Sequence, residues 1–219
     1  DWVGRDMLTR TIKGLSVSMK IGLLATLTST IIAIILGIIG PTFGRRVDAV
    51  VTWFIDLVLS VPHTLVVILI SIAMGGGLKG IVVGVAATHW TSLTRVIRAE
   101  VMQIMESDYT KISKNFGKSN WYIAKEHILP HVIPQIIVNA VLIFPHAILH
   151  EASVTFLGFG LPPHEPAIGV ILSESMKYLT SGYWWLAFFP GLSLILVSMM
   201  VDKIGKNIEQ LINPKTAYK

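Results

Sequence analysis

The 219-residue sequence contains no cysteine, which excludes disulfide bonds, thiolate metal sites and a cysteine nucleophile. Charged residues are scarce as well: they make up 14% of the chain, where a soluble domain has roughly 25%. A phosphate-binding loop of the form G-x-x-x-x-G-K-[ST] is missing, so that motif for holding ATP is excluded. Apolar residues dominate instead, at 53%, with a mean hydropathy of +0.66. This composition predicts an all-α integral membrane protein.

Long stretches without charge predict the membrane spans, since a helix needs about 20 apolar residues to cross the hydrocarbon core. The weakest candidate is the interval 80–99, because polar residues and Arg95 interrupt its apolar sequence. We expect five spans, which lie in the intervals 20–45, 57–78, 80–99, 127–150 and 178–201.

The distribution of Lys and Arg predicts the orientation, because cytoplasmic loops carry an excess of both. With five spans, twelve of the 18 Lys and Arg residues fall on one side of the membrane and six on the other. The side with twelve should be cytoplasmic, and it includes a polar segment, residues 107–130, between the third and fourth spans. The net charge of +5 therefore reflects topology and does not indicate nucleic-acid binding.

The polar segment has the pattern of two short amphipathic helices. Ile112, Phe116 and Trp121 supply apolar faces, and Gly117 lies where a turn needs backbone freedom. Pro130 then allows a new helix to begin. A plain tether would not need this pattern, whereas a loop that docks into a partner's groove would. The alternative is that the three apolar side chains pack against the chain's own helices.

The order of Gly117 and the later His127-Ile128-Leu129-Pro130 is similar to the coupling-loop motif of binding-protein-dependent ABC importer permeases. We therefore call residues 107–130 the coupling segment. Lys111-Ile112-Ser113 stands where that family usually has Glu-Ala-Ala. Three further stretches resemble the second permease subunit of dipeptide, oligopeptide and nickel importers, and these are residues 1–14, 43–62 and 152–169.

The resemblance implies one permease domain over residues 1–219, with the fold of type I ABC importers. The family's subunits have six spans, so the sixth is expected before Asp1. The implied partners are a second permease subunit in a heterodimer, two cytoplasmic ATPase subunits and an extracytoplasmic solute-binding protein. ATP and Mg²⁺ would belong to the ATPases, which leaves this chain without a cofactor and without a reaction of its own. The implied location is the inner membrane of a prokaryote.

Two groups of site residues follow from these patterns. The coupling residues that should contact an ATPase are Lys111, Ile112, Phe116, Gly117, Trp121, His127, Leu129 and Pro130. The other group belongs to the outer segment, residues 152–182, where glycine and proline exclude a regular helix over several positions. Irregular backbone at membrane depth has to be covered by protein or line a cavity, so we expect an outer gate. Its predicted residues are Phe156, Gly158, Phe159, Gly160, Pro163 and Pro166.

Ionisable groups inside spans are costly, so each is a candidate for the solute pathway. The last two histidines are four residues apart on one helix face, and neutral imidazole suits nickel, copper, zinc and cobalt, so His146 and His150 are a candidate metal pair. Each histidine also has a structural interpretation, as a neutral ring bonded to a backbone carbonyl. The predicted solute is nickel, another metal chelate or a short peptide. The pathway candidates are His63, His89, His146, His150 and Glu151.

Parts of the sequence also fit other classes of function. His146, His150 and Glu151 suggest an intramembrane metalloprotease, but their spacing is H-x-x-x-H-E and not the H-E-x-x-H of zinc proteases. A secondary transporter or channel subunit fits the composition. However, neither a secondary transporter nor a channel explains the hinge at Gly117 or the Gly- and Pro-rich outer segment.

Overall fold

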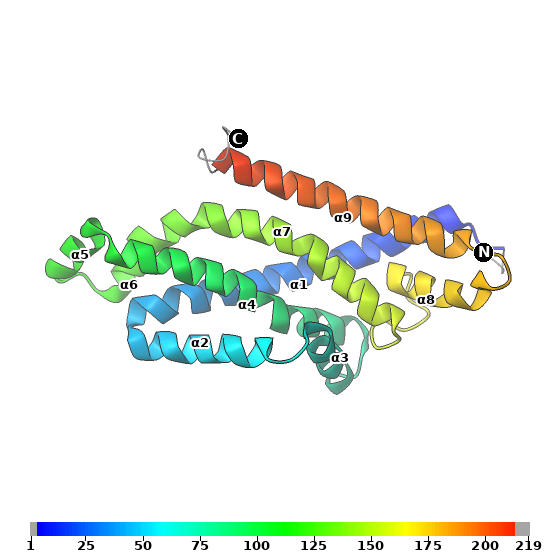
Figure 1. The fold of residues 1–219 in the computed structure, drawn as a ribbon, viewed down its shortest axis with the longest axis horizontal. Helices are drawn as coiled ribbons and strands as arrows, with labels where there is room; N and C mark the ends of the chain where they lie inside the picture. The colour runs from blue at the N-terminus through cyan, green and yellow to red at the C-terminus, as the bar shows by residue number, and fades with distance from the viewer. Residues whose placement is uncertain (1–3, 213–219) are drawn as a thin grey trace.

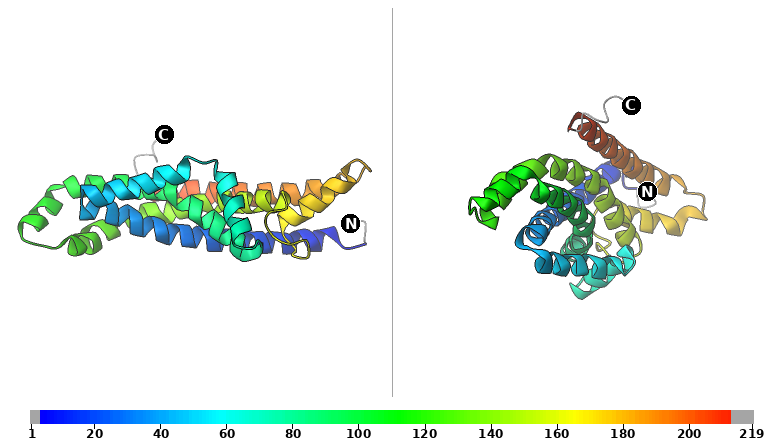
Figure 2. Two further views of the ribbon diagram at one scale, coloured as in Figure 1. Left: turned by 90° about the horizontal axis from the view of Figure 1, so that it is seen from below. Right: turned by 60° about the vertical axis from the view of Figure 1, so that its left-hand side comes forward.

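The computed structural model describes residues 4–212, and every regular element in that range is helical (Figure 1). The prediction of an all-α chain is therefore confirmed for this part of the protein. The helices form an elongated bundle, which Figure 2 shows from two further directions. In chain order the elements are α1 (Met7–Phe43), α2 (Arg45–Leu59), α3 (His63–Ala73), α4 (Gly77–Glu106), α5 (Asp108–Asn115), α6 (Asn120–Ile123), the π-helix η1 (Ala124–Ile128), α7 (Leu129–Phe156), α8 (Ile168–Leu179) and α9 (Trp185–Ile212).

Helix α1 begins at a side-chain cap. The carboxylate of Asp6 accepts hydrogen bonds from the backbone N–H groups of Leu8 at 3.3 Å and Thr9 at 2.9 Å, which satisfies two donors that a helix start leaves free. The helix then runs for 37 residues. Small residues on one face allow close packing: a Cβ added at Gly37 would lie 2.7 Å from Ile97 of α4. Close approach at small residues is the usual way for helices to associate in membranes.

The second predicted span is broken. Helix α2 ends at Leu59, α3 begins at His63, and the two axes differ by 91°. Pro62 precedes α3 and has no backbone N–H, and its ring restricts Val61 to extended conformations, so the first helix cannot continue through this point. The sequence predicted one continuous span over residues 57–78, and the structure shows two separate helices.

Helices α3 and α4 form a tight hairpin. The turn between them contains Gly75, Gly76 and Gly77, whose φ angles of 84°, 74° and 68° are positive and therefore favour glycine. On α4, an added Cβ would lie 2.8 Å from the carbonyl oxygen of Ser71 at Gly80, and 2.9 Å from that of Val67 at Gly84. The backbones of the two helices are thus in direct contact, which fixes α3 on α4.

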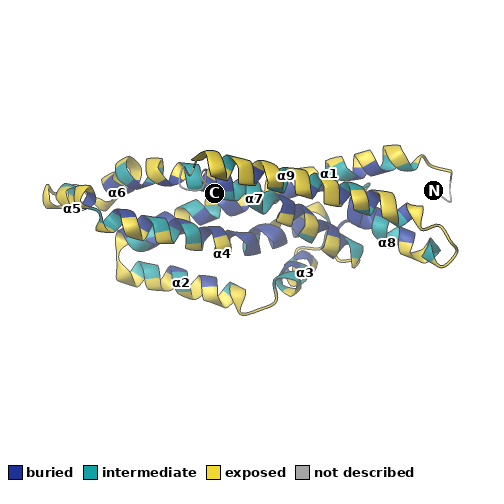
Figure 3. Cartoon of the chain, turned by 45° about the horizontal axis from the view of Figure 1, so that its top comes forward, coloured by how far each residue is buried: buried dark blue, intermediate teal, exposed yellow. Residues whose placement is uncertain are grey.

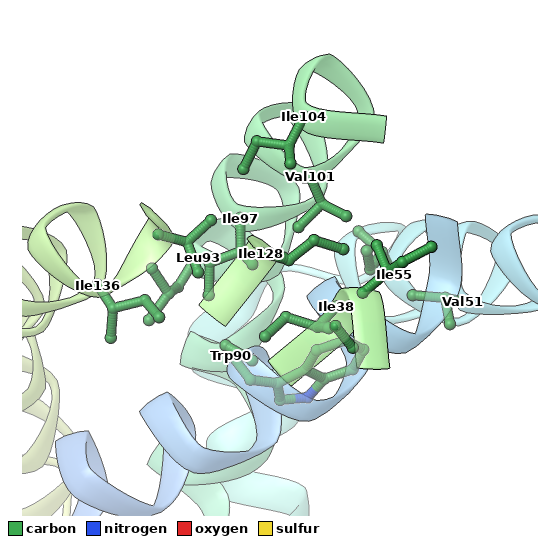
Figure 4. Packing of buried hydrophobic residues seen from close by; sticks show 14 residues of the cluster. Ile38, Val51, Ile55, Trp90, Leu93, Ile97, Val101, Ile104, Ile128 and Ile136 are labelled. Carbon is green, nitrogen blue, oxygen red and sulfur yellow. The ribbon is translucent and has the colours of Figure 1, made fainter. Parts of the chain in front are cut away.

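The largest buried cluster lies between α1, α2, α4, η1 and α7 (Figure 4). Its centre is on α4, where four apolar side chains at helical spacing turn inwards. They are Leu93, Ile97, Val101 and Ile104. Ile38 of α1, Ile55 of α2 and Ile128 of η1 close around them (Figure 4). This cluster joins the end of the bundle that carries α5 and α6 to the long helices.

The predicted total of five spans is not confirmed. By length and composition, three helical segments of the described chain can cross a membrane, Met7–Phe43, Asn120–Phe156 and Trp185–Ile212, and the bent pair of α2 and α3 would be a fourth. Helix α4 has 30 residues, which is long enough. It is more polar than these segments and carries Arg95 and Arg98, so its composition is not apolar enough for a candidate membrane span.

The outward faces of the helices are exposed (Figure 3), and many large apolar side chains lie on them. Trp53 and Phe54 project from α2, and Met199 and Met200 from α9, all with exposed side chains. Exposed apolar area on this scale is typical of a surface covered by lipid or by another subunit. The isolated chain therefore has a membrane protein's exterior on two sides of the bundle.

Candidate functional site

Three of the five pathway candidates meet inside the bundle, each from a different helix. His63 is the first residue of α3, directly after the break at Pro62, while His89 lies within α4 and His150 near the end of α7. The ring centroids of His63 and His89 are 4.6 Å apart, those of His63 and His150 4.3 Å, and those of His89 and His150 5.2 Å. We call these residues the three-histidine cluster.

The cluster has the spacing of a metal-ligand group. One ring nitrogen from each histidine can be chosen so that all three lie within 4.8 Å of one another. In the part of the chain that the structure describes, this is the one group of three or more His, Cys, Asp or Glu side chains with such a spacing.

Hydrogen bonds assign the free nitrogen in one ring. His89 Nδ1 lies 2.9 Å from the carbonyl oxygen of Val85, and because a carbonyl only accepts, Nδ1 carries the hydrogen. His89 Nε2 is then the nitrogen with the lone pair. His63 Nδ1 is buried and has no hydrogen-bond partner among the described residues. A buried polar atom without a partner costs about 1–3 kcal/mol, so this position calls for an explanation.

The other two pathway candidates are not members of the cluster. His146 is exposed, and its Nδ1 is 3.0 Å from the carbonyl oxygen of Leu142 one turn earlier. Glu151 is fully buried and accepts a hydrogen bond of 3.0 Å from the Thr155 hydroxyl on its own helix. The structure thus groups His150 with His63 and His89, a grouping that the sequence did not indicate.

The outer segment leaves α7 and returns to touch the α3–α4 hairpin. The Ser71 hydroxyl donates a hydrogen bond of 2.7 Å to the carbonyl oxygen of Phe159, and Gly77 N–H donates one of 3.1 Å to that of Gly160. An added Cβ at Gly160 would lie 2.2 Å from the Thr155 hydroxyl oxygen, so no larger residue fits there. These bonds fasten the irregular backbone that Gly and Pro produce.

The remaining predicted gate residues surround this fastened turn. Phe156 is the last residue of α7, Gly158 follows with a φ of 87°, Pro163 is exposed and Pro166 half-buried. Helix α8 then packs beside α1, where Glu174 forms an ion pair with Arg10. The gating role of these residues stays a prediction.

The coupling segment lies at the opposite end of the bundle from α8 (Figure 1). It contains two short helices, α5 and α6, and Gly117 between them has a φ of 75°, as the predicted hinge requires. Ile112 is 53%, Phe116 80% and Trp121 67% exposed. The three apolar side chains are therefore largely uncovered in the chain by itself, and their contact with an ATPase stays a prediction.

Polar contacts hold the two short helices on the bundle. Ser113 of α5 lies 2.8 Å from His127 Nε2 in η1, and Lys111 pairs with Glu106 at 3.0 Å. Of the other predicted coupling residues, Leu129 is half-buried and Pro130 exposed at the start of α7. His127 thus supports the segment from within, while the apolar contacts face outwards.

Residues 29–214 match the family described as the inner membrane component of binding-protein-dependent transport systems. The chain belongs to this family. The resemblance predicted from the sequence is thereby confirmed, and the chain is a permease component of an ABC importer. The dipeptide transport system permease protein DppC of Bacillus subtilis is 33% identical over 98% of this chain and 67% of its own length. A putative peptide transport system permease of Brucella suis is 31% identical over 98% of this chain and 72% of its own.

Two solved structures share the fold. An inward-facing form of the MetNI methionine ABC transporter has a TM-score of 0.76 at 14% identity, covering 94% of this chain and 98% of that one. An amino acid ABC transporter crystallised with histidines has a TM-score of 0.60 at 15% identity, covering 98% of this chain and 99% of the other. The described helices therefore have the arrangement of an ABC importer permease.

Proposed function

We propose that this chain forms a membrane pathway together with a second permease subunit, in an ATP-driven importer of metal chelates or short peptides. The pathway opens alternately to the two sides of a prokaryote's inner membrane. A solute-binding protein delivers the solute on the outer side, and two ATPase subunits with their ATP and Mg²⁺ act on the cytoplasmic side. This chain contributes no chemical step.

The observation that carries this proposal is the exposed apolar surface of the coupling segment. Phe116 and Trp121 are largely uncovered at one end of the bundle, next to the hinge at Gly117. Burying a large apolar side chain contributes about 1.5–3 kcal/mol, so an ATPase groove that covers them gains a substantial part of its docking energy. A rigid docked element then transmits the closure of the ATPases to the pathway.

Two solute classes have support from different observations. The names of the relatives in Bacillus subtilis and Brucella suis favour a peptide. The three-histidine cluster favours a metal ion or its chelate. The metalloprotease alternative has less support, because His146 and Glu151 are not in that cluster.

The test is retention of the ATPase subunits during purification of the whole transporter, followed by uptake into vesicles. Phe116→Ala and Trp121→Ala should each weaken docking by about tenfold or more, since the lost burial is at least about 1.5 kcal/mol. Trp184→Ala is the matched control, because this exposed tryptophan lies near the other end of the chain's bundle. Normal retention and uptake in both coupling variants would refute the proposal, and uptake that needs no ATP would favour a channel or secondary transporter.

A further inference from the structure

We propose that His63, His89 and His150 bind a late first-row divalent metal ion, of which Ni²⁺ and Co²⁺ are examples, as cargo on its way through the membrane. The inference rests on the proposed function and names the solute class of the same importer. It replaces the pair His146 and His150, which the sequence suggested, with a site built from three helices.

The geometry needs little adjustment to hold an ion. Imidazole nitrogens lie about 2.0–2.1 Å from a bound metal, so two ligands of one tetrahedral ion are about 3.4 Å apart. The three chosen nitrogens already lie within 4.8 Å of one another. Binding would therefore require the rings to reorient so that the ligand nitrogens come closer by up to about 1.4 Å. The three ligands come from α3, α4 and α7, so one bound ion would join three helices.

A hydrogen bond orients at least one of the three rings in the way that is usual for a metal ligand. Metal-bound histidines almost always donate their other ring N–H to a carbonyl, a carboxylate or water, which orients the ring and raises its basicity. His89 does this, with Nδ1–H donating to Val85. Its Nε2 is the nitrogen left for an ion.

An unpartnered nitrogen of His63 is consistent with a ligand in this cluster. Most buried side-chain polar atoms in native structures have a hydrogen-bond partner, and those without one need an explanation. His63 Nδ1 is buried and has none among the described residues. A metal ion beside the other two rings would supply the missing partner.

The cluster also lies where a pathway is expected. The backbone from Ser60 to Pro62 is non-helical and exposed directly before His63. Non-helical backbone at membrane depth is tolerated only where protein covers it or where it lines a cavity. The break therefore places His63 beside the second subunit or beside water, and a cargo site needs such access.

The donor set selects the kind of ion. Three neutral imidazoles suit nickel, cobalt, copper and zinc, whereas magnesium and calcium need oxygen ligands. Three ligands leave positions open, which allows the ion to arrive with other ligands and to depart. They also leave the double charge uncompensated in an apolar surrounding, which is costly. A chelate that brings its own carboxylates removes this cost, so we expect the chelated ion to bind more tightly than the free one.

The experiment measures binding of Co²⁺ and Ni²⁺ to the purified whole transporter without ATP, by equilibrium dialysis and by the visible absorption of Co²⁺. Each metal is offered as the free ion and as its histidine complex, so that binding of the free ion and binding of the chelate are measured separately. We expect one ion per copy of this chain. His63→Ala, His89→Ala and His150→Ala should each weaken binding at least tenfold, because loss of even an outer partner of a metal ligand costs about that much.

His146→Ala is the matched control, since His146 lies on the same helix as His150 but outside the cluster. His150→Cys keeps a metal ligand at position 150, so it tests the site even where an alanine variant fails to fold. The chain has no other cysteine, so a sulfur-to-cobalt charge-transfer band would place the metal at residue 150. No bound metal, or binding that the three alanine variants leave unchanged, would overturn the inference. Because the measurement needs no ATPase docking, failure of the proposed coupling would not affect it.

Discussion

Gly169→Ala is the substitution for which the structure gives the sharpest expectation. Gly169 is the second residue of α8, and α8 crosses the end of α7 at this point. A Cβ at this position would lie 2.5 Å from the carbonyl oxygen of Ala152, 2.7 Å from Thr155 Cβ and 3.1 Å from the Phe156 nitrogen. Two of these three atoms are backbone atoms of a long helix, so no side-chain rotation relieves the contact. We expect α8 to move away from α7.

The expected loss of stability follows from these distances. The closest contact is 0.9 Å shorter than the 3.4 Å at which ordinary van der Waals contact begins. Overpacking of this kind costs typically 1–3 kcal/mol, or about 3 here because backbone must shift. The higher helix propensity of alanine offsets up to about 1 kcal/mol of this loss in the free energy of unfolding. The net loss is then about 2 kcal/mol, which corresponds to roughly 4–8 °C in the unfolding midpoint for a chain of this size.

Gly191→Ala is the matched control for this prediction. Gly191 is a helical glycine of α9, and the nearest atom to its added Cβ is Leu172 Cδ2 at 3.8 Å. Here only the propensity gain of about 1 kcal/mol applies, so the midpoint should stay or rise. Both variants would be measured by thermal unfolding of the purified transporter, with uptake into vesicles in parallel. Equal midpoints for Gly169→Ala and Gly191→Ala would refute the packing of α8 on α7.

Two further predictions concern the coupling end of the molecule. Gly117→Ala places an L-residue at a φ of 75° with no atom within 4 Å, so its cost of about 1–2 kcal/mol is conformational and should reduce ATPase retention. Gly117→Asn should be milder, because asparagine tolerates this region, and equal losses would contradict the hinge. Arg98→Ala removes two hydrogen bonds of 2.5 and 2.6 Å to Asp48 and should cost about 1.5–3 kcal/mol. Arg95→Ala removes an exposed pair with Asp56 and should cost about 1 kcal/mol or less, so equal shifts in unfolding midpoint would contradict this.

The coupling segment could be predicted from sequence because its signals are local. A positive φ at Gly117 depends on the few residues around it. Phe116 and Trp121 lie on the apolar faces of two short helices, and a local pattern is enough to predict these faces. The break near Pro62 has a local cause, but its angle does not. A proline ends a helix, whereas the 91° angle between α2 and α3 is set by the contact of α3 with Gly80 and Gly84 of α4.

The three-histidine cluster could not be predicted, because no local signal joins residues 63, 89 and 150. Helical spacing paired His146 with His150, since sequence reasoning sees one helix at a time. Which residue of α7 faces α4 depends on the rotation of α7, and that rotation is fixed by packing over its whole length. The number of spans is uncertain from sequence for a related reason. Helix α4 is buried by its neighbours, so it needs less apolar composition than a helix that faces lipid.

Helix α4 joins all the sites described above. It begins at Gly77, whose N–H is bonded to Gly160 of the outer segment, it carries His89, and it ends at Glu106 beside the coupling segment. Its 30 residues correspond to about 45 Å without an internal proline. In the proposed importer, an ATPase that displaces α5 would act on one end of a continuous helix whose other end holds the outer segment. Alternating access requires such a connection, and a cargo ligand on α4 would move with it.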